Sequence, residues 1–172
     1  MKSDEGWYYL YVSYEDCSSA KVDSIYISVK HNPADPPCTV ADNSVDFSSI
    51  PSINLSSVTW GIDGSYNKKT LSGYYASGYP DINIYFHNYW KGHEPEDGEY
   101  GLGSLLSLDE EDPYVVYIAS KYSGILFQAS GGSVFVSHVN GKLKVTFCDI
   151  NLKGSDGSNS YQTTASGALT AP

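Results

Sequence analysis

Apolar and polar residues alternate along most of this chain, and this pattern restricts the fold more than any other feature. Two alternating runs, 133–139 and 142–147, flank the dipeptide Asn140-Gly141. A period of two places alternate side chains on opposite faces of a strand and does not suit a helix. Asn and Gly both tolerate the positive φ of a tight hairpin turn. The segment 133–147 is therefore predicted to be a β-hairpin.

Similar runs recur from end to end, and no window of a dozen residues shows a 3.6-residue period. About ten short strands at regular spacing predict an all-β fold, an antiparallel β-sandwich of the jelly-roll or immunoglobulin-like kind with little or no helix. We expect a single domain over residues 1–172, with 1–58 as a possible extra layer or N-terminal annex. The predicted core consists of Ile82, Ile84, Phe86, Val116, Ile118, Val134, Val136, Leu143, Val145 and Phe147.

The charge balance excludes several classes of partner. The chain carries 20 acidic and 10 basic residues, all of the latter lysine, for a formal charge of -10. Nucleic acids require a basic face and favour arginine, so they are excluded as partners. No stretch approaches the ~20 apolar residues that a membrane span needs.

A predicted strand over residues 81–90 carries the candidate binding surface. Its apolar residues share one face, and the opposite face would present an aromatic stripe that could stack against sugar rings. The predicted ligand-binding residues are Tyr85, His87, Tyr89 and Trp90. The alternative is that these tyrosines are ordinary strand residues, because tyrosine is common in strands.

Acidic residues in two loops raise the alternative of a glycoside hydrolase, which would need two carboxylates facing each other across a cleft. The candidates are Glu94, Glu96, Glu99 and Asp112. Charged runs of this kind are usually solvated loops without the apolar neighbours that raise a catalytic pKa. The chain is therefore predicted not to be an enzyme, with no catalytic residues.

Two Asp-Gly turns offer oxygen ligands suited to calcium, from Asp63 and Asp156. Turn chemistry explains the same residues, because Asp-Gly is first of all a turn-forming pair. No other cofactor is expected.

The three cysteines form no metal-binding pair. Cys17 and Cys38 lie in polar, loop-like surroundings and could form a disulfide, whereas Cys148 lies within a strand pattern and is expected to be a buried free thiol. The alternative is that all three are reduced.

The N-terminal sequence shows no apolar leader, so the chain is either cytoplasmic or the mature part of an exported protein. Its composition favours export, to the extracellular space, the cell surface or the periplasm. The aromatic strand at 7–14 could add to the sheet edge of another subunit, and the alternative is an ordinary first strand.

The C-terminal half resembles small exported β-sandwich proteins and lipoproteins of Bacteroidota, mostly of unassigned function. The resemblance spans roughly 81–170 and is carried by the segments 81–86, 98–102, 131–136, 140–150 and 165–167. It implies an exported, envelope-associated domain without catalytic residues. Lys2-Ser3-Asp4-Glu5 is similar to the start of mature surface lipoproteins, if Met1 stands in for the anchoring cysteine.

Together these features predict a non-enzymatic exported or cell-envelope domain that binds a glycan or another envelope protein. The alternatives are a structural subunit that self-assembles through its N-terminal strand, and a glycoside hydrolase.

Overall fold

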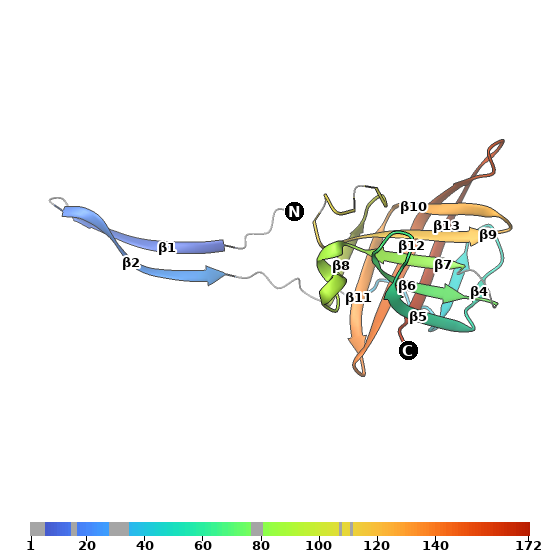
Figure 1. Ribbon diagram of the computed structural model, residues 1–172, viewed down its shortest axis with the longest axis horizontal. Helices are drawn as coiled ribbons and strands as arrows, with labels where there is room; N and C mark the ends of the chain where they lie inside the picture. The colour runs from blue at the N-terminus through green and yellow to red at the C-terminus, as the bar shows by residue number, and fades with distance from the viewer. Residues whose placement is uncertain (1–5, 15–16, 28–34, 77–80, 107, 111) are drawn as a thin grey trace. The chain divides into compact units, whose positions relative to one another are not determined.

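The computed structural model describes residues 6–14, 17–27, 35–76, 81–106, 108–110 and 112–172 (Figure 1). The chain divides into two compact units, Met1–His31 and Asn32–Pro172, and each is described by itself. The lipoprotein-like residues 2–5 lie outside the described residues.

The N-terminal unit is a two-stranded antiparallel hairpin of β1 (Gly6–Tyr14) and β2 (Cys17–Ile27). Trp7 pairs with Tyr26 near the open end, and Tyr14 pairs with Cys17 near the turn. The strand expected at 7–14 is thus confirmed. Cys17 was expected in a loop, and the structure instead places it at the start of β2.

The larger unit is one 11-stranded sheet. Its neighbouring strands are antiparallel except for β8 and β9, which are parallel. The described residues contain no α-helix, and their one helical segment is a short 3-10 helix, η1 (Asn88–Gly92). The strands are β3 (Ser44–Phe47), β4 (Ile53–Asn54), β5 (Ser57–Ile62), β6 (Lys69–Tyr74), β7 (Ile82–Phe86), β8 (Gly98–Leu102), β9 (Val115–Tyr122), β10 (Ile125–Gly131), β11 (Ser133–Val139), β12 (Lys142–Ser155) and β13 (Ser160–Thr170).

The hairpin predicted around Asn140-Gly141 is confirmed. Both residues have positive φ, 54° and 76°, and Val139 pairs directly with Lys142 on either side of them. Two positive φ values give the turn a twist that matches the right-handed twist of the flanking strands.

The path of paired strands closes on itself through the long strand β12. Along one edge β12 pairs first with β11 and then with β10, while β9 pairs with both β8 and β10. Gly132 lies between β10 and β11 with a φ of 120°, and Asp149 in β12 has a φ of 49° beside a shift in strand register. The register shift beside Asp149 is typical of a β-bulge, which bends a strand, and Gly132 separates the two strands that pair with β12 along that edge. The strands of this closed path lie together in Figure 1.

One large apolar core is built from two groups of strands, which we call the two arms of the sheet. One arm contributes core residues from β6, β7 and β9, and the other contributes them from β3, β11, β12 and β13. All ten residues predicted for the core are buried. Burying a side chain of this size contributes about 1.5–3 kcal/mol to stability. A second, smaller cluster of Tyr85, Leu108, Tyr117 and Ala119 is separate from the main core.

The cysteine prediction is wrong, because Cys148 is paired with Cys38 in a disulfide across a sequence separation of 110. The partners meet because β3, which follows Cys38, pairs with β13, and β13 pairs with β12, which contains Cys148. This order of strands is not visible in the spacing of the cysteines. The disulfide is consistent with an oxidising, extracytoplasmic environment. No helix in the described residues is long and apolar enough to cross a membrane.

Candidate functional site

The strand predicted over residues 81–90 ends early. β7 stops at Phe86, and His87 then caps the helix η1 by accepting a hydrogen bond from the backbone N–H of Tyr89 on its Nδ1, at 2.9 Å. Because this cap turns the chain into a helix, the alternation beyond Phe86 no longer places side chains on one face. The predicted aromatic stripe is therefore not formed.

The four predicted binding residues consequently separate. Tyr85 is buried in the second cluster, and Tyr89 is 56% exposed. Trp90 belongs to the main core, where its indole N–H donates to the carbonyl of Pro113 at 2.7 Å. Tyr85 lines a hollow on the larger unit. The role of the other three in binding stays a prediction.

A groove next to Tyr85 is the strongest candidate for a binding site. Tyr85 of β7 is paired with Tyr117 of β9, and their ring centroids are 5.8 Å apart. The ring of Tyr66, from the turn between β5 and β6, stands perpendicular to Tyr85 at 5.6 Å. We call this hollow of about 240 Å³ the tyrosine groove, and its lining residues are Tyr66, Tyr85, Ser104, Leu105, Leu106, Tyr117, Leu126 and Gln128.

The tyrosine groove combines a buried floor with an exposed aromatic and aliphatic rim. Tyr85 and Tyr117 are each only 5% exposed, whereas Tyr66 and Leu126 are about half exposed and Leu106 is almost fully exposed. Isolated exposed apolar residues are common, but three around one hollow indicate a contact surface.

The two buried phenols of the groove, Tyr85 and Tyr117, remain protonated at neutral pH. Burial, reinforced by the charge of Asp63, raises the pKa of Tyr85 to about 12. Burial also raises the pKa of Tyr117, although a hydrogen bond with Gln128 opposes this shift. The two buried phenols are therefore neutral hydroxyl groups that can both donate and accept hydrogen bonds.

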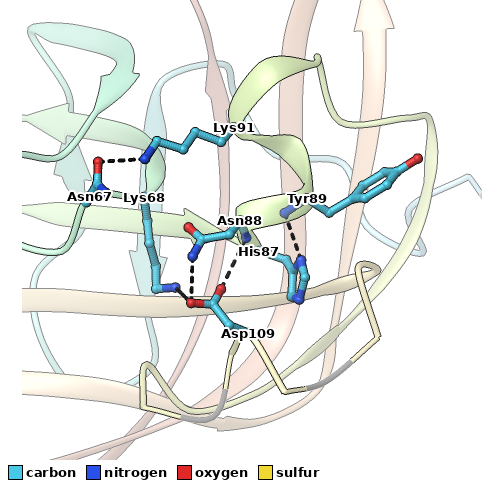
Figure 2. A network of polar contacts seen from close by, with 7 residues as sticks. All are labelled: Asn67, Lys68, His87, Asn88, Tyr89, Lys91 and Asp109. Carbon is cyan, nitrogen blue, oxygen red and sulfur yellow. Dashed lines mark hydrogen bonds and ion pairs between the residues drawn. The ribbon is translucent and has the colours of Figure 1, made fainter.

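An ion pair between a buried lysine and a partly exposed aspartate fixes the segment that forms one wall of the groove (Figure 2). The ammonium of Lys68, a buried residue, lies 2.7 Å from the carboxylate of Asp109. The same carboxylate accepts hydrogen bonds from the backbone N–H and the side-chain amide of Asn88. Partial burial raises the pKa of Asp109, but the bonds from Lys68 and Asn88 outweigh it and lower the pKa overall. Asp109 directly follows Leu108, which packs under the wall residue Leu105.

A second bond connects η1 to the turn that carries Tyr66. Lys91 donates from its ammonium to the side-chain carbonyl of Asn67 at 2.8 Å (Figure 2). Together with the bonds to Asp109, this bond holds η1, the β5–β6 turn and the wall segment together. The Nε2 atom of His87 is buried and has no hydrogen-bond partner among the described residues.

Three of the four carboxylates considered for hydrolysis have structural partners. Glu94 accepts from the indole N–H of Trp60 at 3.1 Å, and Glu96 accepts from the phenol of Tyr114 at 2.7 Å. Asp112 accepts from a backbone N–H, and Glu99 is exposed on β8. None of the four lines the tyrosine groove.

The two aspartates considered for calcium lie in turns, as expected. Asp63 accepts the backbone N–H groups of Ser65 and Tyr66 on Oδ1. Asp156 accepts from the phenol of Tyr161 and from Asn159, and these bonds lower the pKa of Asp156 well below its usual range. In the part of the chain that the structure describes, no three His, Cys, Asp or Glu side chains gather in a metal-binding arrangement.

No family model matches the chain, and neither a curated protein nor a solved structure is significantly similar to it. The resemblance to exported Bacteroidota proteins therefore stays a prediction. Sequence reasoning missed Tyr66, Tyr117 and Lys68. Tyr117 is visible as one residue of a predicted strand, but nothing in the sequence indicates that it lies beside Tyr85.

Proposed function

We propose that this chain is a non-enzymatic, extracytoplasmic binding domain and that the tyrosine groove holds its ligand, a glycan. The observation that carries the proposal is the groove itself, in which three tyrosines from separate elements converge. The disulfide between Cys38 and Cys148 supports the extracytoplasmic location.

Aromatic rings with neutral hydroxyl and amide groups are suited to a sugar. The C–H face of a sugar ring packs on an aromatic ring, and its hydroxyls pair with groups that both donate and accept. Tyr66 provides the exposed ring, while Ser104 and Gln128 provide polar groups in the same lining. Shape and hydrogen bonding would then determine which glycan is held.

Glycan-array binding tests the proposal with two single variants of the full chain. Tyr66→Ala removes the exposed ring of the groove. Tyr75→Ala is the matched control, because Tyr75 is 62% exposed and lines a different hollow. We expect glycan binding by the wild type and by Tyr75→Ala, and its loss in Tyr66→Ala. Absence of glycan binding, or equal binding by all three proteins, would overturn the proposal.

We further propose that the two arms of the sheet pack as the layers of an antiparallel sandwich, of the jelly-roll or immunoglobulin-like kind. The shared core supports this arrangement.

A structural subunit is the second candidate function, and the N-terminal hairpin favours it. Among the described residues β1 pairs only with β2, so each strand has an edge without a partner strand. A two-stranded hairpin is marginally stable alone, and β1 carries no charge or proline to discourage addition of another strand. Addition of a strand from another subunit would give the open edge of the hairpin a hydrogen-bonded partner.

Light scattering during size-exclusion chromatography distinguishes this candidate. If the hairpin drives assembly, the wild type forms oligomers and Leu10→Pro, which disrupts β1, is a monomer. Gly64→Ala, in a turn of the larger unit, is the control and should assemble like the wild type. A monomeric wild type, or assembly that survives Leu10→Pro, would exclude the strand-addition role.

A further inference from the structure

The tyrosine groove has no formal charge in its lining. Its polar groups are three phenols, the hydroxyl of Ser104 and the amide of Gln128, alongside three leucines. Each of these polar groups can donate and accept a hydrogen bond. Such a lining matches a ligand made of hydroxyl groups and offers no cation to a carboxylate, sulfate or phosphate.

A negative charge lies at the edge of the groove. The carboxylate of Asp63 accepts the backbone N–H of Tyr66 at 2.8 Å, so it is adjacent to a lining residue. It is also near enough to Tyr85 to disfavour ionisation of that phenol. The nearest lysine in the sequence, Lys68, is neutralised by Asp109. Lys121 and Lys153 pair in register with the lining residues Leu126 and Gln128, but neither lysine lines the groove itself. The net charge of -10 has the same sign as Asp63, so the chain as a whole disfavours an anionic ligand.

The volume of the groove limits how much of a ligand it encloses. Its 240 Å³ is below the roughly 300 Å³ at which pockets for drug-sized ligands begin. A single sugar ring is therefore the unit that fits, with the rest of the chain in solvent.

We propose that the tyrosine groove is a subsite for one uncharged sugar ring, with Tyr66 as the stacking surface and Asp63 as the group that excludes acidic sugars. This inference rests on the proposed function and names the class of glycan. Asp63 acts on specificity through its charge, since its Oδ1 is already occupied by the N–H groups of Ser65 and Tyr66.

Paired methyl glycosides test this class directly. The probes are methyl glycosides of several neutral hexopyranoses and of the matching hexuronic acids, which differ by one carboxylate. Saturation-transfer NMR titrations would use the full-length wild type, Tyr66→Ala, Tyr75→Ala and Asp63→Asn. Asn retains the oxygen that accepts the turn N–H groups but removes the charge.

We expect at least one neutral glycoside to bind wild type and Tyr75→Ala, and to bind Tyr66→Ala about tenfold more weakly or not at all. The matching uronate should bind the wild type about tenfold more weakly than the neutral sugar does. This difference in affinity should become smaller at high salt and in Asp63→Asn. Unchanged amide NMR spectra away from the turn would confirm that Asp63→Asn keeps the fold.

Equal binding of uronate and neutral sugar, or a gap that Asp63→Asn leaves unchanged, would overturn the charge selection. Array binding that depends on Tyr66 without binding of any neutral monosaccharide would overturn the single-ring subsite and leave the proposed function standing. Absence of glycan binding in both experiments would remove the inference together with the proposed function.

Discussion

Removing the disulfide between Cys38 and Cys148 should substantially lower the free energy of unfolding of the larger unit. The change is the double variant Cys38→Ser/Cys148→Ser, which removes both thiols and so prevents mispairing with Cys17. A disulfide stabilises a protein mainly by restricting the unfolded chain, and the effect grows with the logarithm of the loop it closes.

The size of the expected stability loss follows from the sequence separation of 110 between the two cysteines. For a loop of this length the chain-entropy model gives about 5 kcal/mol at 25 °C, and measured losses are typically about 2–5 kcal/mol. The total free energy of unfolding of a domain is about 5–15 kcal/mol, so the loss is a large fraction of it. The melting temperature should fall by about 10 °C or more.

Urea denaturation followed by tryptophan fluorescence measures the difference. We expect the midpoint to fall for the double variant, and for the wild type after reduction, while Cys17→Ser retains the wild-type midpoint because Cys17 is outside the bridge. A loss below about 1 kcal/mol, or the same loss in Cys17→Ser, would refute the reasoning, because the long loop would then not be closed in the folded protein.

Three further predictions concern single positions. Gly141→Ala should cost about 1–2 kcal/mol in chemical denaturation, because alanine is strained at a φ of 76°, whereas Gly64→Ala, which has open space for a Cβ, should cost little. Asp109→Asn should cost about 1–2 kcal/mol and more than Lys68→Met, because it leaves a buried ammonium unpaired while Asp109 itself is 43% exposed. Because folding lowers the pKa of Asp109, the ionised carboxylate contributes fully to the free energy of unfolding above the unfolded pKa of about 4, and this contribution is lost as the pH falls further. In acid denaturation the wild type should therefore lose more stability than Asp109→Asn. Equal losses in the two proteins would contradict this. Gly167→Ala should cost about 1–3 kcal/mol in thermal unfolding, because its Cβ would lie 2.5 Å from the ring of a buried phenylalanine in β12, and an unchanged melting temperature would contradict this contact.

The strands and the core were predictable because their signals are local. A period of two fixes which side chains share a face, and this rule identified buried residues such as Ile84 and Val136 correctly. The Asn140-Gly141 turn was predictable because its two residues tolerate a backbone conformation that most residues avoid. The same rule failed after Phe86, where the side chain of His87 caps a helix and competes with the strand.

The candidate site was not predictable, because it depends on which strands become neighbours. Tyr85 and Tyr117 are distant in sequence and meet only because β7 pairs with β9 in one particular register. The pairing of Cys38 with Cys148 depends in the same way on the order of β3, β13 and β12.

The amino-acid sequence by itself determined the all-β class, the hairpin and the buried faces, since each follows from side-chain alternation and turn chemistry within a few residues. The tertiary structure decided the disulfide, the Lys68–Asp109 pair and the tyrosine groove. These features join residues from separate elements, and their distances are set by strand order and register, which local patterns do not encode.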